Sequence, residues 1–166
     1  SSGQGDTTWT PFRRDKMIRE LRKEVENNNF SLKIKIHPTN EKIKDYQKIL
    51  NDNSNIEIIQ NEDIYELIEK SDVILTTSAN TAASIALILK KPIVIWNYFD
   101  VKGDLFLKNK IVLECKNSSE INNCLNNAKK FSISNDVHIK NFIKKFLGNG
   151  DALTKIANGI EQIIKK

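Results

Sequence analysis

A run of hydroxyl and amide side chains at residues 76–81, Thr-Thr-Ser-Ala-Asn-Thr, is the part of this sequence best suited to chemistry. It separates an apolar segment at 73–76 from an apolar, helix-like segment at about 80–89. At such a junction, the free backbone N–H groups and the helix dipole favour a bound anion. The side chains expected to assist are Thr77, Ser78, Asn80 and Thr81. Ordinary helix capping by Ser78 or Asn80 is the plainer interpretation, and it is compatible with phosphate binding.

Polar residues also follow other predicted strands. His37 ends an alternating segment at 32–36, where an imidazole can donate a hydrogen bond to a phosphate oxygen; the alternative is a half-exposed histidine bonded at a strand end. Gln60 follows an apolar segment at 56–59 and is the candidate for contact with a nucleobase edge. Two weaker candidates, in a glycine-containing first segment and after an apolar strand, are Gly5 and Asn97.

Other chemistry is disfavoured. His138 lies in a predicted surface helix and is expected to be inert. Cys115 and Cys124 are too few for a disulfide framework or metal site and are interpreted as small apolar residues in a reducing compartment. Asp100 and Asp104 suit a metal or a sugar hydroxyl, but a solvated loop explains them equally well. No catalytic triad or carboxylate pair is apparent, and neither a metal nor a cofactor is predicted.

The bulk composition indicates one globular domain spanning residues 1–166. Its 39% hydrophobic and 28% charged residues are ordinary values, and no apolar run approaches the roughly 20 residues that span a bilayer. The net charge of +5 comes from lysines spread along predicted helices without an RNA-binding motif, so nucleic acid is not expected as a partner. Alternatively, the positive charge attracts anionic ligands or a membrane surface weakly.

Strands and helices alternate along the sequence, which predicts βαβ units and a mainly parallel sheet. We expect strands at 32–36, 56–59, 73–76, 93–96 and 111–113. We expect helices at 13–27, 40–50, from Asn61 or Asp63 to Lys70, and at 80–89, 119–130, 136–147 and 151–164. The predicted fold is a Rossmann-like three-layer α/β/α domain with five or six parallel strands. Such a sheet would require another strand before Ser1, so we expect the chain to be part of a larger protein.

The order of these elements resembles the C-terminal, donor-binding half of GT-B-type glycosyltransferases that build surface polysaccharides. Capsule and polysialic acid synthases and the teichoic-acid-type CDP-glycerol glycerophosphotransferases are the nearest in pattern. The matching segments, at 34–38, 64–75, 80–83 and 91–94, lie within residues 34–94, a little over a third of the chain. Two positions depart from the family pattern: Ile85 stands where a ribose-binding Glu is common, and Lys90 stands where Gly is common.

The resemblance implies a cytoplasmic transferase domain, either free or at the inner face of the membrane, that binds a CMP-, CDP- or UDP-linked donor for transfer to a glycan acceptor. The catalytic base would come from a missing N-terminal domain, so this chain alone would bind nucleotide and catalyse little. One alternative is a non-catalytic α/β module that docks a partner subunit, which the absent Glu and the basic surface favour. Another is a UDP-N-acetylglucosamine 2-epimerase-like domain. A homodimer formed through an exposed apolar face is also open.

Overall fold

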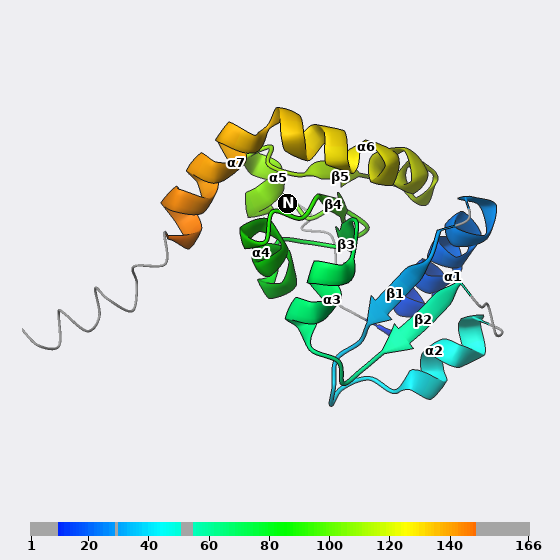
Figure 1. Cartoon of the computed structure of the whole chain (residues 1–166). Helices are drawn as coiled ribbons and strands as arrows, with labels where there is room; N and C mark the ends of the chain where they lie inside the picture. Colours follow the sequence, from blue (N-terminus) through cyan, green and yellow to red (C-terminus); the bar gives the residue numbers. More distant parts are fainter. Residues whose placement is uncertain (1–9, 29, 51–54, 149–166) are drawn as a thin grey trace, which may run out of the picture.

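The computed structural model of the chain describes residues 10–28, 30–50 and 55–148, in which short strands alternate with helices (Figure 1). The strands are β1 (Leu32–Lys35), β2 (Ile56–Ile59), β3 (Ile74–Thr76), β4 (Ile93–Trp96) and β5 (Leu113–Cys115). The helices are α1 (Pro11–Asn28), α2 (Ile43–Leu50), α3 (Ile64–Lys70), α4 (Thr81–Ile88), α5 (Leu105–Lys108), α6 (Ile121–Ser134) and α7 (Asp136–Phe142). A 3₁₀ turn, η1 (Ser118–Glu120), precedes α6, and a π-helical turn, η2 (Ile143–Leu147), extends α7.

Most predicted elements are present, with shifted ends. β2 and β4 have the predicted bounds, whereas β5 begins two residues later than expected. The sequence did not predict α5, whose single turn is capped by the Asp104 side chain. The helix predicted at 151–164 and the candidate Gly5 lie outside the described residues.

The five strands form two parallel sheets, which corrects the prediction of one sheet with five or six strands. β1 pairs with β2 in the register Leu32 to Ile56, and the second sheet has the order β3-β4-β5. Two strands that are joined through α2, α4 or α5 are hydrogen-bonded to each other. The connection from β2 through α3 to β3, in contrast, passes from one sheet to the other. Within the described ranges no ladder joins β1 to β3, and Figure 1 shows the two sheets as separate ribbons.

Two apolar clusters cover the two faces of the three-stranded sheet. The α1 cluster comprises buried side chains of α1, α2 and α6 together with β2, β5, one face of β4 and Ile36, which follows β1. Partly buried side chains of β1 pack against it. The α4 cluster comprises buried side chains of α3, α4, α5 and α7 on the opposite face. Val94 and Trp96 point into the α1 cluster and Ile93 and Ile95 into the α4 cluster, so all four β4 residues are buried. A strand covered on both faces is expected to be apolar throughout.

The longest helix among the described residues, α1, turns one apolar stripe toward the core, as its 3.6-residue periodicity predicts. Met17, Ile18, Leu21 and Val25 are its buried residues. In the part of the chain that the structure describes, no helix combines the length and apolarity needed to cross a membrane.

Removal of a core aromatic side chain tests the α4 cluster. Phe106 is 1% exposed, and its ring packs edge-to-face with Phe142 at a centroid distance of 5.5 Å. We expect Phe106→Ala to lower the free energy of unfolding by about 3–5 kcal/mol in urea titrations. Phe12→Ala is the matched control, because Phe12 is 79% exposed and its loss should cost under about 0.5 kcal/mol. Equal losses would contradict the assignment of Phe106 to the core.

Both cysteines are free and buried, as the sequence suggested for small apolar residues. Burial is the main cause that raises the pKa of Cys115 from 9.0 to about 12, and burial also raises the pKa of Cys124. The thiols therefore stay protonated in the folded state at pH values where the unfolded chain ionises. We expect a thiol-specific reagent to modify both slowly in the native protein at pH 8 and rapidly in urea. The free energy of unfolding should decrease as the pH rises from about 9 toward 12.

Candidate functional site

The predicted site residues follow the carboxyl ends of β1, β2, β3 and β4. The first turn of α1 connects these ends: the Arg13 guanidinium lies 5.9 Å from the ring centroid of Phe99, which follows β4. The neighbouring Arg14 guanidinium lies 3.8 Å from the carboxylate of Asp45 in the first turn of α2, which follows β1. The carboxyl ends of both sheets therefore lie at the same end of α1. This is the end at which open parallel sheets bind ligands.

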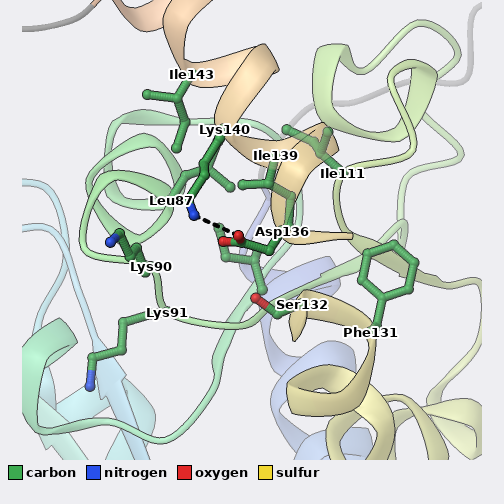
Figure 2. Close-up of a pocket in the computed structure, with 11 residues that line it drawn as sticks. Leu87, Lys90, Lys91, Ile111, Phe131, Ser132, Asp136, Ile139, Lys140 and Ile143 are labelled. Carbon is green, nitrogen blue, oxygen red and sulfur yellow. Dashed lines mark ion pairs between the residues drawn. The ribbon is translucent and has the colours of Figure 1, made fainter. Parts of the chain in front are cut away.

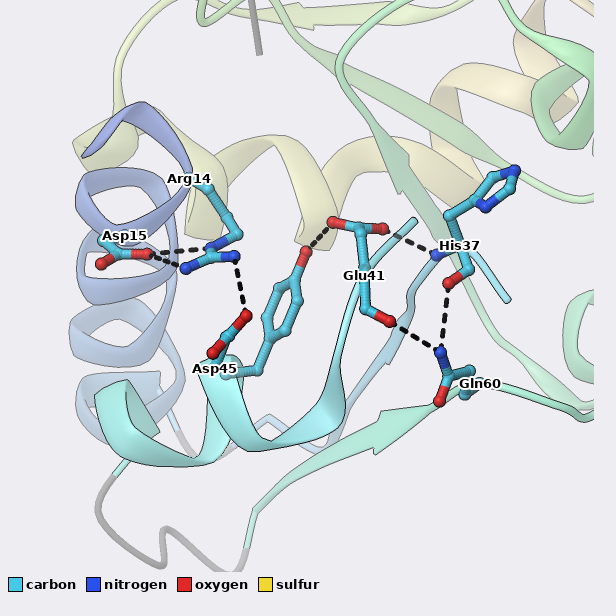
Figure 3. Close-up of polar contacts among 7 residues, drawn as sticks. Arg14, Asp15, His37, Glu41, Asp45 and Gln60 are labelled. Atoms are coloured by element: carbon cyan, nitrogen blue, oxygen red, sulfur yellow. Dashed lines mark hydrogen bonds and ion pairs between the residues drawn. The ribbon is translucent and has the colours of Figure 1, made fainter. Parts of the chain in front are cut away.

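His37 lies in the exposed turn that follows β1. Its Nδ1 atom accepts backbone N–H groups of Thr39 and Asn40, each at 3.2 Å. Because Nδ1 is an acceptor, these bonds assign the ring proton to Nε2. In Figure 3 the His37 ring points away from Glu41 and Gln60. The exposed imidazole thus presents an N–H donor toward solvent.

The Gln60 side chain holds this turn. Its Nε2 amide donates to the backbone carbonyl oxygens of His37 at 3.3 Å, Pro38 at 3.1 Å and Glu41 at 2.8 Å. These three bonds commit the amide nitrogen to the main chain. Gln60 is therefore a positioning residue for the His37 turn, a role that the sequence did not suggest because its partners lie 19 to 23 residues away.

Glu41 fixes the same turn from the other side (Figure 3). One carboxylate oxygen accepts the His37 backbone N–H at 2.7 Å, and the other accepts the Tyr46 hydroxyl. Burial and the adjacent Glu41 carboxylate raise the pKa of Tyr46, so its hydroxyl remains a donor. The Arg14 guanidinium stacks 5.1 Å from the Tyr46 ring and pairs with Asp15 at 2.7 Å. No local sequence pattern predicts this network.

The turn after β3 is organised by Asn80, the N-cap of α4. Its Oδ1 atom accepts the Ala83 backbone N–H at 2.8 Å, and its Nδ2 group donates to Thr76 Oγ1 at 2.9 Å. The predicted capping role of Asn80 is confirmed, and the cap uses both ends of the amide. Asn97 is similarly committed, since its Nδ2 donates to Glu114 at 2.8 Å and its Oδ1 accepts the Val101 N–H at 2.8 Å.

Asp104 links this turn to the segment after β4. Its Oδ2 atom accepts the Ala79 backbone N–H at 2.6 Å, and its Oδ1 atom accepts the N–H groups of Phe106 at 2.9 Å and Leu107 at 3.1 Å. Only 8% of the residue is exposed. Both oxygens thus serve the backbone, which argues against the metal or sugar-hydroxyl role considered from the sequence.

Several donors remain without an intramolecular partner at this end of the molecule. Among the described residues, no hydrogen bond engages the Thr77, Ser78 and Thr81 hydroxyls or the backbone N–H groups of Thr81 and Ala82. Asn80 and Thr81 are exposed, and the residues on either side are partly exposed. The turn after β3 can therefore donate hydrogen bonds to a ligand through side chains and main chain together.

No cluster of metal-ligating side chains accompanies these donors in the part of the chain that the structure describes. Among residues 10–28, 30–50 and 55–148, no group of three or more His, Cys, Asp or Glu side chains is arranged to hold a metal ion. Because the turns offer hydrogen-bond donors, the ligands that suit them are those that accept hydrogen bonds.

A small pocket occurs elsewhere, between the end of α4 and the α6–α7 corner (Figure 2). Lys91 and Ile111 on its wall precede β4 and β5, which places it at the amino ends of these strands. An ion pair of 2.6 Å between Lys140 and Asp136 lies on its wall. It is therefore separate from the turns at the carboxyl ends. His138 is also remote, with Nε2 2.7 Å from the Asn109 carbonyl oxygen.

Comparisons of the chain with protein-family models, with curated proteins and with solved structures gave no match. The function of the chain is therefore inferred from the geometry of the turns.

The role of Asp104 can be tested by an isosteric change. Asp104→Asn replaces one acceptor oxygen with an NH₂ group, so either Ala79 or the first turn of α5 loses its acceptor. We expect the free energy of unfolding to fall by about 1–3 kcal/mol. The matched control is Asp63→Asn, because Asp63 caps α3 through Oδ1 alone and Asn preserves that cap. An equally small effect of both changes would contradict the proposed bridging role.

Proposed function

We propose that this chain is the donor-binding domain of a GT-B-type transferase, which binds a nucleotide-activated sugar or polyol phosphate for surface-glycan synthesis. One observation carries the proposal: hydrogen-bond donors without intramolecular partners follow β1 and β3 at the same end of the molecule. We also propose that the two sheets are parts of one Rossmann-like three-layer fold. Its strand order is β2-β1-β3-β4-β5, and the hydrogen-bond ladder is interrupted between β1 and β3. Ligands bind at the carboxyl edge of such sheets.

The turn after β3 suits a phosphate group. α4 follows it directly, so the positive end of the helix dipole and the free N–H groups of Thr81 and Ala82 face the same place. The hydroxyls of Ser78 and Thr81 supplement the main chain. Asn80 and Asp104 contribute indirectly, because they fix the turn through bonds that a ligand need not break.

His37 suits a second contact with the same ligand. The Nε2–H donor assigned to it would approach a phosphate oxygen, and such a bond would stabilise the negative charge that develops on a departing nucleotide. Gln60 and Glu41 hold the turn, so little ordering would be required on binding. Ile85 stands where the resembled family commonly has a ribose-binding Glu, and its apolar side chain cannot hydrogen-bond a ribose hydroxyl. Other groups would have to recognise the ribose.

A non-catalytic docking module is the second candidate, favoured by the apolar surface of α4. Ile88 and Leu89 at its end are 56% and 40% exposed, and α4 is apolar on nearly every side. A module of this kind would bind a partner through α4 and would have no affinity for nucleotides. Nucleotide binding therefore separates the two candidates.

Thermal unfolding in the presence of CMP, CDP, UDP, GDP and their sugar conjugates tests the proposal. A ligand that binds the native state, present at about 100 times its dissociation constant, should stabilise it by about 2.7 kcal/mol. We expect at least one pyrimidine nucleotide to raise the melting temperature. Loss of a hydrogen bond to a charged group costs about 1.5–3 kcal/mol, so His37→Ala and Ser78→Ala/Thr81→Ala should each reduce that shift strongly.

His138→Ala provides the control, because it removes the chain's other imidazole at a site remote from the turns. The ligand-induced shift should be unchanged in this variant. If no nucleotide stabilises the wild-type chain, or if His37→Ala responds like His138→Ala, the proposed site is wrong. The docking module would then be the better account.

A further inference from the structure

The edge of β1 that does not face β2 carries unpaired backbone groups. The N–H groups of Leu32 and Ile36 donate to Asn55 and Ile59 on the β2 side. Because successive residues of a strand direct their backbone groups to opposite edges, those of Lys33 and Lys35 point to the other edge. No backbone partner for them occurs in the ranges that the structure describes.

β3 has an equivalent unpaired edge. The Ile74 N–H donates to the Pro92 carbonyl oxygen next to β4, so the backbone groups of Leu75 point away from β4. No described residue pairs with them. Exposed strand edges of this kind are templates for a further strand.

The helix layer shows that both unpaired edges border the same space. α1 packs against α2, which contacts β2, and on its other flank against α6, which contacts β4 and β5. The helices of this layer therefore lie in the order α2-α1-α6. α2 covers the sheet formed by β1 and β2, and α6 covers the sheet formed by β3, β4 and β5. The position between the two sheets corresponds to α1. The intervening position lies beneath α1.

Side-chain burial supports the same conclusion. The β1 residues Leu32 and Ile34 and the β3-side residues Val73 and Leu75 pack on the α1 cluster but are only partly buried. Val94 and Trp96 on the same face of β4, with a neighbouring strand on each side, are fully buried. An apolar strand between β1 and β3 would cover the four incompletely buried side chains.

We infer that β1 and β3 form a slot for one additional parallel strand, an apolar segment joined to the N-terminal side of α1. α1 begins at the carboxyl ends of both sheets, as the contacts of Arg13 with Phe99 and of Arg14 with Asp45 show. A strand that precedes α1 and connects to it at that end must therefore run toward that end, parallel to β1 and β3. It would accept from and donate to the backbone groups of Lys33, Lys35 and Leu75. This inference does not depend on nucleotide binding.

The test is to extend the chain before Ser1 with a designed strand, Val-Lys-Ile-Val-Ile-Val, and to measure amide hydrogen exchange. We expect exchange at the N–H groups of Lys33, Lys35 and Leu75 to slow by at least about tenfold, and the melting temperature to rise. The control extension, Val-Lys-Pro-Val-Pro-Val, keeps the length but removes two N–H donors and the strand conformation. It should leave exchange at all three sites unchanged.

The Ile95 amide in the centre of β4 reports that each protein is folded, since its exchange should be slow in all of them. Light scattering after gel filtration gives the oligomeric state. Unchanged exchange at Lys33, Lys35 and Leu75 in a folded, extended chain would overturn the inference. So would slow exchange at these sites in the unextended monomer, or their protection within a dimer, in which a second copy would fill the slot.

Discussion

Packing against α1 is the interaction on which the arrangement of this molecule depends. Within the described part of the chain the two sheets share no hydrogen-bond ladder, so side-chain contacts hold them together. Ile18, Leu21 and Val25 supply the middle of the apolar cluster that both sheets contact. Apolar contact is non-directional, and it sets no register as a ladder would. The two arginines at the start of α1 add the directional contacts, because they connect the segments that follow β1 and β4.

Polar side chains from distant positions set the shape of both candidate turns. Gln60 and Asp104 each form three hydrogen bonds to backbone groups, and most of those groups belong to a different segment of the chain. Because these two side chains satisfy the main chain, the hydroxyls of the β3 turn and the Nε2 atom of His37 remain available to a ligand. Residues that appear suited to ligand contact in a sequence can thus act by positioning others.

The helices and strands of this fold were predictable where they depend on residue type and on immediate neighbours in the sequence. The continuous apolar run of β4 and the caps provided by Asp63 and Asn80 follow from residue type and immediate neighbours. α5 was missed because four residues are too few to show a helical period. The shift of β5 arose because Ile111 and Val112 are buried by packing although they precede the strand.

The division into two sheets and the roles of Gln60 and Asp104 were not predictable. Strand pairing and bonds across 19 to 25 residues depend on tertiary placement, which no local pattern encodes. Residue type and position at a strand end were therefore enough to identify the candidate residues. Only the structure shows which of them position the turns and which remain available as donors. Asn97 is an example, since nothing in its neighbourhood indicates the bond to Glu114.

The two apolar clusters differ in which parts of the chain they contain, and this has a consequence for cooperativity. The α4 cluster is built wholly from residues between Ile64 and Leu147, whereas the α1 cluster joins α1, β1, α2 and β2 to the rest of the molecule. Separation of α1 from α6 would release α1, β1, α2 and β2 as a unit while the α4 cluster stayed intact. The fold therefore contains a route for partial opening at lower free energy than global unfolding. That opening would carry the His37 turn away from the β3 turn without unfolding either sheet.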